Sequence, residues 1–219
     1  MNRVKVKICC ILNIEEAEVA IGLGADAIGL AGPIPSGPGI ISNEQIRHIV
    51  DNLPENVDSF LLTSETRAED IVAHHKLVGT KTIQLVDKLE SACYQQIRDS
   101  IPGINIVQLI HINDHQSVEY ALSLIDHVDA LLLDSGNPNL KLKQLGGTGK
   151  VHDWDLSKQI VNKSTIPVYL AGGLSPTNVT DAIRAVSPYG VDLCSGVRTE
   201  GRLDNEKLIQ FFDVVNNVE

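Results

Sequence analysis

Eight short β-rich runs alternate with eight longer helical patterns, and this alternation restricts the possible folds more than any other feature of the chain. The predicted strands are 3–11, 26–31, 59–63, 82–86, 105–112, 129–134, 167–173 and 191–196. The predicted helices are 14–24, 42–53, 67–78, 89–101, 115–128, 153–163, 175–186 and 204–217. Cap-type residues precede or open several of these helices, namely Asn13, Ser42, Ser175 and Asp204. Strict alternation predicts parallel strands joined by crossover helices.

The number of units distinguishes two parallel α/β architectures. A closed (β/α)₈ barrel needs eight strand–helix units, whereas a doubly wound sheet usually has fewer strands and an early G-x-G-x-x-G turn. The chain has eight units and no such turn, and no linker or composition shift divides its 219 residues. We therefore expect an α/β protein with a single (β/α)₈ TIM-barrel domain over residues 1–219. Its chemistry should lie at the C-terminal ends of the strands.

Composition and charge argue against several classes of partner. The formal net charge of −10 disfavours a nucleic-acid interface, which needs a basic surface. No run approaches the roughly 18 apolar residues of a membrane span, and the N-terminus lacks a signal-peptide pattern. The cysteines show no zinc-type spacing, and a bridge between the neighbours Cys9 and Cys10 would be strained. We expect free thiols in a cytoplasmic protein with no membrane or nucleic-acid partner.

Glycine-rich segments follow the last two predicted strands. Gly172 and Gly173 stand just before a predicted helix, and Ser195 and Gly196 end the predicted strand 191–196. Small residues let backbone N–H groups approach an anion, and the loops after strands 7 and 8 of (β/α)₈ barrels often hold a phosphate. Glycines can also serve only to make tight turns. Because two such loops occur at the two expected positions, we favour a phosphate site.

A third glycine loop covers residues 144–150, after the sixth predicted strand. Its glycines include Gly147 and Gly149, and Lys150 is either an anion partner or a solvated surface lysine. The full G-x-x-x-x-G-K-[ST] spacing is absent, and Val151 supplies no hydroxyl for Mg²⁺. The loop therefore does not indicate a nucleoside triphosphate site.

The first strand carries a candidate base or nucleophile. Lys7 and Cys9 share one face of the strand, and Val6 and Ile8 share the other, which should face the helices. A nearby ammonium group lowers the pKa of a thiol, so Cys9 with Lys7 beside it is suited to proton transfer. The alternative is that Cys9 is a small buried hydrophobic residue, as free cysteines often are.

The sixth strand carries a candidate acid. Asp134 closes an apolar run at the expected reactive face, where partial burial would favour its protonated form. The alternative is a carboxylate that structures the following loop. His111 and Asp192 are further candidates at the barrel mouth. The remaining histidines have no spacing typical of a metal site, so we expect no metal.

Five segments together resemble the phosphoribosylanthranilate isomerase family of tryptophan biosynthesis. They are VKICC (6–10), DALLLDS (129–135), GGTGKVHDW (146–154), LAGGLSPTNV (170–179) and PYGVDLCSGV (188–197). The resemblance runs the length of the chain in the same order, and the combination of GGTGK-x-x-DW with AGGL-x-P-x-NV is highly specific.

This resemblance implies an Amadori-type aldose–ketose isomerisation without a metal or organic cofactor. The family's substrate is a phosphoribosyl amine whose aryl group carries a carboxylate. Its ring opens to an imine, C2 loses a proton, and the resulting enolamine becomes a ketone. The family's cysteine base falls on Cys9 and its aspartic acid on Asp134. Its phosphate loops fall on Gly172–Gly173 and Ser195–Gly196, with the glycines of 146–150 nearby, and its strand-8 aspartate matches Asp192.

The chain also departs from the family pattern. Gly39 occupies the place of a ligand-gripping arginine, within the glycine- and proline-rich stretch 28–42. Val86 replaces the histidine of a QLHG motif, Cys10 replaces the glycine of KICG, and Arg198 replaces the glutamate of SSGVE, in which Cys194 also replaces a serine. We expect Gly39, Val86 and Arg198 to lie at the rim of the site, where Arg198 would supply the missing positive charge.

Three functions remain open from the sequence. The first is phosphoribosylanthranilate isomerisation with Cys9 as base and Asp134 as acid. The second is a paralogous isomerase of another phosphosugar or aminosugar phosphate, which the uncharged stretch 28–42 favours. The third is a non-catalytic phosphosugar-binding barrel, against which the intact Cys9 and Asp134 argue. In each case the partner is a small phosphorylated sugar, and the protein is a monomer or homodimer.

Overall fold

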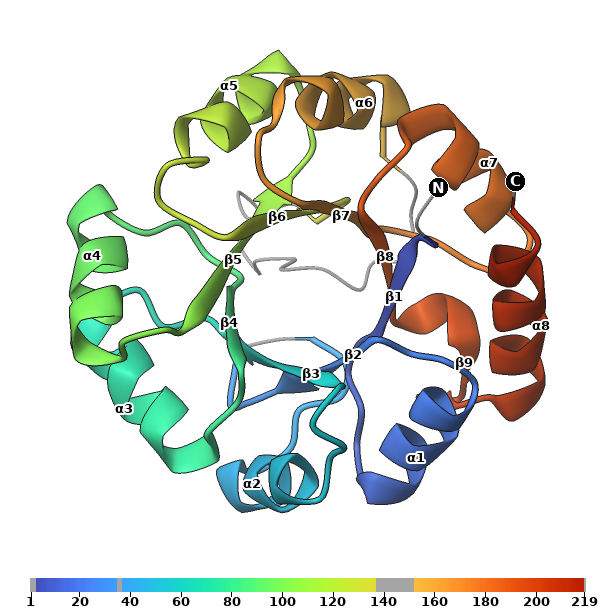
Figure 1. Ribbon diagram of the computed structural model, residues 1–219, viewed down its shortest axis with the longest axis horizontal. Coiled ribbons are helices and arrows are strands. Elements are labelled where there is room, and N and C mark those ends of the chain that lie inside the picture. Colours follow the sequence, from blue (N-terminus) through green and yellow to red (C-terminus); the bar gives the residue numbers. More distant parts are fainter. Residues whose placement is uncertain (1–2, 35–36, 137–151, 219) are drawn as a thin grey trace.

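A closed barrel of eight parallel strands forms the centre of the molecule (Figure 1). The computed structural model describes residues 3–34, 37–136 and 152–218. The strands are β1 (Lys5–Ile8), β2 (Ala27–Ala31), β3 (Asp58–Thr63), β4 (Thr82–Leu85), β5 (Asn105–His111), β6 (Ala130–Asp134), β7 (Val168–Leu170) and β8 (Gly190–Leu193). Each strand pairs with its neighbours in chain order, and β1 pairs with β8 to close the barrel. The predicted (β/α)₈ TIM-barrel fold is confirmed.

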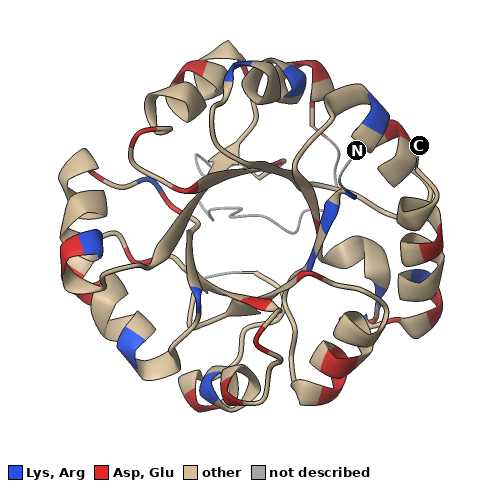
Figure 2. Cartoon of the chain, viewed as in Figure 1, with Lys and Arg blue, Asp and Glu red and all other residues tan. Residues whose placement is uncertain are grey.

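In the part of the chain that the structure describes, eight α-helices surround the barrel and cover its outer surface (Figure 1). They are α1 (Ile14–Gly22), α2 (Asn43–Asp51), α3 (Ala68–Val78), α4 (Ser91–Ser100), α5 (His115–Ser123), α6 (Trp154–Lys163), α7 (Val179–Val186) and α8 (Asn205–Asn216). Figure 2 shows acidic and basic segments interspersed around this ring of helices. None of the helices within the described ranges is both long and apolar enough to span a membrane.

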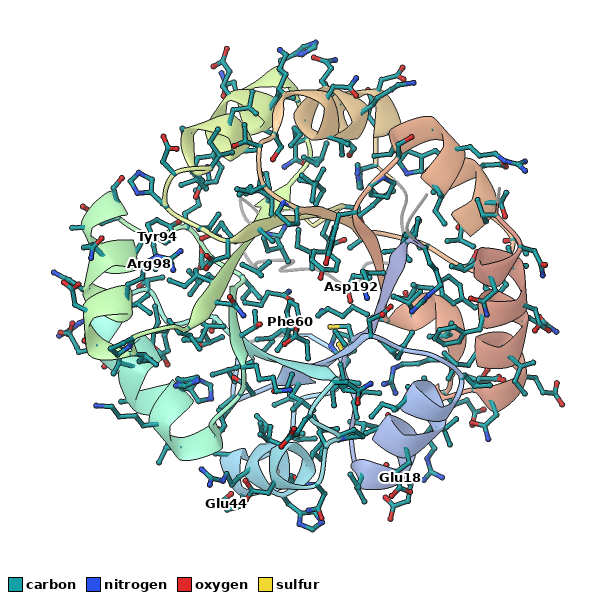
Figure 3. All side chains as sticks on the ribbon, in the orientation of Figure 1. Glu18, Glu44, Phe60, Tyr94, Arg98 and Asp192 are labelled. Carbon is teal, nitrogen blue, oxygen red and sulfur yellow. The ribbon has the colours of Figure 1, made fainter. Side chains whose placement is uncertain are left out.

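The alternating side chains of the strands build two apolar layers. Val6 and Ile8 belong to the layer between strands and helices, while Cys9 belongs to the cluster inside the barrel. Lys7 also points inward and is fully buried. The predicted division of strand β1 into an apolar outer face and a polar inner face is confirmed. Figure 3 shows Phe60 inside the barrel, where its ring packs edge-on against that of Tyr169 at a centroid distance of 6.1 Å.

Strand β1 is shorter than the predicted strand 3–11 because the chain turns sharply after Cys9. Cys10 has a φ of 63°, in the left-handed region that non-glycine residues seldom adopt. The Cys9 N–H still donates to the Leu193 carbonyl at 2.7 Å, and the Ile11 N–H donates to the Gly29 carbonyl at 3.0 Å. The turn is therefore held on both sides by the neighbouring strands β8 and β2.

Most helix starts follow the predicted caps, with one exception. Ser42 forms a capping box with Gln45, and Asn13 and Asp204 accept hydrogen bonds from the first turns of α1 and α8. The prediction that Ser175 opens a helix is wrong, because α7 begins at Val179 with Asn178 as its N-cap residue. Residues 175–178 instead form a tight turn, in which the Asn178 N–H donates to the Ser175 carbonyl.

A small addition between β8 and α8 was not predicted. It consists of the one-turn helix η1 (Ser195–Val197) and the antiparallel pair β9 (Arg198–Thr199) and β10 (Arg202–Leu203). Strands of two residues are too short to give a periodic sequence pattern. This addition places Arg198 next to the end of β1, as described below.

Candidate active site

A hollow of about 660 Å³, counted to its open mouth, lies at the C-terminal ends of the strands. The loop after β2 lines it as well. The lining residues are Cys9, Cys10, Ala31, Ile34, Gly37, Pro38, Leu62, Gln84, Val86, Leu109, Asp134, Ala171, Gly172, Gly173, Leu174, Asp192, Cys194 and Ser195. The hollow therefore brings together many of the residues predicted from the ends of separate strands.

Cys9 lies on the wall of the hollow, directly after β1. Its side chain is 4% exposed, and its sulfur packs over the backbone of Gly29 on β2. A Cβ at Gly29 would lie 2.8 Å from Cys9 Sγ and 3.0 Å from Lys7 Nζ, so the thiol and the ammonium group occupy one small space. The Cys10 thiol donates to Cys9 Sγ at 3.7 Å.

Lys7 forms a buried ion pair beneath this wall. Its Nζ donates to Asp192 Oδ1 at 2.9 Å and lies 5.1 Å from the centre of the Phe60 ring. Burial lowers the pKa of Lys7, but attraction to Asp192 and Cys9 outweighs it, so the pKa is raised above its ordinary value. Asp192 lines the hollow and points into the barrel in Figure 3. Lys7 thus fixes the position of the Asp192 carboxylate by an ion pair inside the barrel, and the ammonium group itself does not line the hollow.

Asp134 ends β6 on the wall opposite the β1–β2 pair. It is 6% exposed, and its Oδ1 accepts hydrogen bonds from the Ser135 N–H at 2.6 Å and the Ser135 hydroxyl at 3.3 Å. A Cβ at Gly172 would lie 3.0 Å from Asp134 Oδ1 and 3.0 Å from His152 Nδ1. A glycine at position 172 is therefore what allows the loop after β7 to pack against the carboxyl group.

The loops after β7 and β8 form one continuous glycine-rich rim. Gly172 and Gly173 have φ values of 84° and 65°, which glycine adopts at little cost. Gly196 packs so closely against the backbone of Leu174 that any Cβ would collide with the Leu174 carbonyl. Among the described residues, the backbone N–H groups of Gly173 and Gly196 donate no hydrogen bond. Backbone N–H groups that are not used within the described structure are available to an anion.

The loop after β2 packs against Cys10 at Gly39, where the family pattern has an arginine. Gly39 has a φ of 71°, and a Cβ there would lie 2.5 Å from Cys10 Cβ and 2.7 Å from the Cys10 carbonyl oxygen. No side chain fits at Gly39 without moving this turn. Ile34 and Pro38 line the hollow from the same loop and make its wall apolar.

Arg198 does not lie at the rim, contrary to the prediction. Its side chain is buried, and its Nη2 donates to the Cys10 carbonyl at 2.5 Å and to the Cys9 carbonyl at 3.4 Å. It also forms an ion pair with Glu16 of α1, with Nη2 at 3.0 Å from Oε2. The guanidinium group therefore holds the backbone of the Cys9–Cys10 turn, and Arg198 does not itself line the hollow.

Glu16 pairs with the buried Arg198 guanidinium group and so offsets the cost of burying its charge. Besides Arg198, its carboxylate accepts from the Leu203 N–H at 3.0 Å and the Leu12 N–H at 3.1 Å. Burial raises the pKa of Glu16, but the hydrogen bonds from Arg198 and Leu203 outweigh it and hold the pKa below its ordinary value. Nothing in the local pattern around Glu16 indicated this role, since its partner lies 182 positions away.

Gln84 within β4 and Val86 directly after it both line the hollow. Val86 is 2% exposed and forms part of the apolar wall with Leu62 and Leu109. Gln84 is 1% exposed, and its Oε1 has no hydrogen-bond partner within the described part of the chain. Sequence reasoning missed Gln84, although its polar side chain two positions before Val86 on the inward face was an available signal.

His111 ends β5 beside a neighbouring hollow that also contains Lys88 and Tyr120 and shares Val86 and Leu109 with the first. Burial lowers the pKa of His111 to about 4, so the ring is neutral near pH 7. His152 was missed from sequence. Burial lowers its pKa to about 4 as well, and its Nε2 lies 2.7 Å from Ser157 Oγ.

The predicted glycine loop 144–150 and the question of a metal site are considered last. Gly147, Gly149 and Lys150 lie outside the described residues. Within residues 3–34, 37–136 and 152–218, no three His, Cys, Asp or Glu side chains converge in a way that could hold a metal ion.

Residues 6–214 match the family model described as N-(5'phosphoribosyl)anthranilate (PRA) isomerase. The N-(5'-phosphoribosyl)anthranilate isomerase of Nostoc punctiforme is 36% identical over 220 residues, covering 98% of this chain and 100% of the relative. The enzyme of the same name from Methanocella arvoryzae is 34% identical over 208 residues, covering 95% of each chain.

Solved structures show the same architecture. Phosphoribosyl anthranilate isomerase from Thermotoga maritima superimposes with a TM-score of 0.84 at 29% identity, covering 97% of this chain and 98% of the other. A phosphoribosyl anthranilate isomerase in complex with reduced 1-(o-carboxyphenylamino)-1-deoxyribulose 5-phosphate superimposes with a TM-score of 0.81 at 27% identity and the same coverage.

Proposed function

Because this chain belongs to the N-(5'-phosphoribosyl)anthranilate isomerase family of tryptophan biosynthesis, we propose that Cys9 and Asp134 catalyse its aldose–ketose isomerisation. The observation that carries this proposal is the convergence of three groups in one hollow. A thiol from β1, a carboxyl group from β6 and a glycine-rich rim from the loops after β7 and β8 face the same space.

The glycine-rich rim holds the substrate phosphate. Gly173 and Ser195 line the hollow, and Gly196 follows Ser195 in η1; together they present backbone N–H groups and a hydroxyl at the end of the barrel where this fold often binds phosphate. A phosphate there leaves the sugar to extend across the mouth. The related isomerase crystallised with reduced 1-(o-carboxyphenylamino)-1-deoxyribulose 5-phosphate binds a ligand with these two ends, a phosphate and an arylamine.

Asp134 acts first, as the general acid. Its proton passes to the ring oxygen of the phosphoribosyl amine, the bond from that oxygen to C1 breaks, and the nitrogen lone pair forms the C1 imine. Gly172 keeps the carboxyl group accessible at the wall because a side chain there would lie within 3.0 Å of it. A positioned acid or base of this kind contributes about 10²–10⁴-fold to a rate.

Cys9 acts second, as the general base. Its sulfur removes the proton from C2, and the electrons of that bond move towards the imine to give the enolamine, which then becomes the ketone. The ammonium group of Lys7 shares the space over Gly29 with the sulfur and stabilises negative charge there. Asp192, which Lys7 supports, faces the hollow beside the sugar.

The apolar wall opposite the phosphate rim receives the aryl ring. Ile34, Pro38, Leu62, Val86 and Leu109 line this side. Flat aromatic rings bury well against such side chains. Gly39 packs closely against Cys10, so position 39 presents no charged side chain to the ring. The wall therefore holds the aryl ring by apolar packing.

The test is turnover of N-(5'-phosphoribosyl)anthranilate by the purified protein, together with rescue of a tryptophan auxotroph that lacks the isomerase. We expect Cys9→Ala and Asp134→Asn each to lower kcat/KM by about 10²–10⁴-fold and to abolish rescue. The matched controls are Cys93→Ala on α4 and Asp213→Asn on α8, which remove the same groups far from the hollow and should retain activity.

Folded variants of Cys9 and Asp134 that keep the activity of the unaltered protein would refute the residue roles. A folded protein that does not turn over this substrate but accepts another aminosugar phosphate would identify the paralogous function. We also infer one domain over residues 1–219, because β1 and β8 close the same barrel. A cytoplasmic location and a monomeric or homodimeric state stay predictions, the latter testable by sedimentation.

A further inference from the structure

A buried amide group without hydrogen-bond partners lines the candidate active site. Gln84 on β4 is 1% exposed and is part of the wall of the hollow. Within the described part of the chain its enclosed Oε1 accepts no hydrogen bond, and its Nε2 donates none. Buried polar groups in folded proteins are almost always paired, and an unpaired one destabilises the fold. The roles proposed above for the thiol, the carboxyl group and the glycine-rich rim leave this amide without a function.

A second buried glutamine, on the neighbouring strand β5, has a fully paired amide group. Gln108 is 0% exposed, and its Oε1 accepts a hydrogen bond from the Tyr94 hydroxyl of α4 at 2.8 Å. Its Nε2 lies 3.0–3.2 Å from three backbone carbonyl oxygens, those of Leu85, Asp87 and Leu109. The two glutamines are equally buried, but Gln108 faces the helices and pairs with the protein, whereas Gln84 faces the hollow. The partners of Gln84 are therefore to be sought in a ligand.

The position of Gln84 indicates which part of the substrate it meets. Gln84 pairs in register with Leu62 of β3 and lies two residues before Val86 on the inward face of β4. Leu62 and Val86 belong to the apolar wall proposed for the aryl ring, so the amide lies at the base of that wall. The sugar connects the aryl ring to the phosphate on the opposite rim. Its first carbons, C1 to C3, are therefore the part of the substrate nearest to Gln84.

The chemistry of an amide group selects among the polar groups of the substrate. An amide has an acceptor oxygen and a donor nitrogen, and both need partners here. The aryl carboxylate only accepts hydrogen bonds, so it cannot pair with Oε1. The amine N–H is ortho to that carboxylate, which accepts its proton within the same molecule. Two adjacent sugar hydroxyls can both donate and accept, so they alone satisfy both ends of the amide.

We propose that the Gln84 amide binds the adjacent hydroxyl groups on C2 and C3 of the sugar, an assignment that rests on the isomerase function proposed above. Oε1 accepts a hydrogen bond from one hydroxyl, and Nε2 donates to the other. Gln84 thereby determines which sugar is accepted, because a sugar without one of these hydroxyls leaves the buried amide unpaired again.

Binding at C2 also affects the proton transfer. The proposed base Cys9 removes the proton from C2, and a hydrogen bond to the hydroxyl on the same carbon fixes the direction of the C2–H bond relative to the sulfur. Misplacement of a reacting group by about 1 Å costs about 10²-fold in rate. Loss of the Gln84 amide should therefore lower kcat as well as weaken binding.

The test compares Gln84→Met with the matched variant Gln108→Met by thermal unfolding and steady-state kinetics. Methionine has a similar length and no amide group. Gln84→Met removes an unpaired amide, so Tm should rise by about 2–4 °C while kcat/KM falls by about 10–100-fold. Gln108→Met leaves the Tyr94 hydroxyl and the backbone carbonyls without their partner, so Tm should fall by at least about 4 °C. A residue with a purely structural role would not combine higher stability with lower activity.

A second measurement uses the 3-deoxy analogue of N-(5'-phosphoribosyl)anthranilate. The unaltered protein should lose at least about tenfold in kcat/KM on this analogue relative to the full substrate. Gln84→Met should lose less than about threefold on the same change, because the partner of the missing hydroxyl is already gone.

Three results would overturn the proposal. One is a Tm of Gln84→Met that falls as far as that of Gln108→Met, another is an unchanged kcat/KM in Gln84→Met. The third is an equal loss on the 3-deoxy analogue with and without the amide. Any of these leaves the roles of Cys9 and Asp134 intact, since their own variants test them. Failure of the isomerase function would instead appear as absence of turnover by the unaltered protein.

Discussion

Replacing Gly29 by alanine should displace the candidate base Cys9 without altering any residue that lines the hollow. Gly29 lies on β2 beneath Cys9, and an added Cβ would lie 2.8 Å from Cys9 Sγ, 3.0 Å from Lys7 Nζ and 3.2 Å from Cys9 Cα. Ordinary carbon contacts begin about half an ångström further out. The backbone of Cys9 cannot retreat, because its N–H is bonded to the Leu193 carbonyl. The sulfur and the ammonium group must therefore move.

Overpacking sets the expected loss of stability, and displacement of the Cys9 thiol sets the expected loss of kcat/KM. An extra methyl group in a close-packed interior costs about 1–3 kcal/mol, which for a chain of this size lowers Tm by roughly 2–12 °C. A shift of about 1 Å in a catalytic group costs about 10²-fold in rate. We therefore expect Gly29→Ala to fold with reduced stability and to lose about 10²-fold in kcat/KM.

The assay pairs thermal unfolding with steady-state kinetics for Gly29→Ala and for Gly22→Ala. Gly22 ends α1 and has no atom within 4 Å of the added Cβ, so the same change there meets open space. It should leave kcat/KM unchanged and leave stability equal or up to about 1 kcal/mol higher, because alanine favours helix. If Gly29→Ala matches Gly22→Ala in both Tm and kcat/KM, the proposed packing of Cys9 over Gly29 is wrong.

Three further predictions concern the ion pair, the buried histidines and the glycine rim. Lys7→Met leaves the Asp192 carboxylate buried without its partner and should lower the free energy of unfolding in urea by about 3–5 kcal/mol. Adding Asp192→Leu to Lys7→Met should recover most of this loss. A loss below about 1 kcal/mol in Lys7→Met alone would show that the buried ion pair is not needed for stability. Burial holds the pKa values of His111 and His152 near 4, below the ordinary value of 6.5, so the unfolded chain binds protons first as pH falls. The stability contributed by the two neutral imidazoles is complete above pH 6.5 and is lost between pH 6.5 and 4, with about 1 kcal/mol lost for each histidine by pH 5.5. A His111→Gln, His152→Gln variant should show a smaller change in the free energy of unfolding over this pH range. Gly196→Ala places a methyl group into the backbone carbonyl of the loop after β7, and its KM should rise at least about tenfold relative to Gly22→Ala; an unchanged KM would exclude this rim as the phosphate site.

Several features of the site were predictable because they depend on local pattern and on the general geometry of the fold. Alternating side chains on 3–11 put Lys7 and Cys9 on the inner face of β1, and the parallel order of the strands put Asp134 on the same mouth. The glycines after β7 and β8 followed from their positions at strand ends. In each case, one segment and its place in the repeat were sufficient.

Other features depend on residues far apart in the chain. Arg198 was expected at the rim, but Glu16 and the carbonyls of Cys9 and Cys10 hold it behind the first turn, and these contacts span more than 180 positions. The resemblance led us to expect that Gly39 stands in the place of an arginine, but only the structure shows that Cys10 fills the space in which a side chain would begin.

The sequence by itself determined the eight-unit barrel, the end of the barrel that bears the chemistry, and the thiol and carboxyl candidates. Hydrophobic periodicity and strand order are properties that a segment carries with it. The tertiary structure decided which charges are paired in the interior, namely Lys7 with Asp192 and Arg198 with Glu16. It also decided that the thiols of Cys9 and Cys10 are in contact. Those outcomes depend on packing between the first and last strands, where the barrel closes and the two ends of the sequence become neighbours.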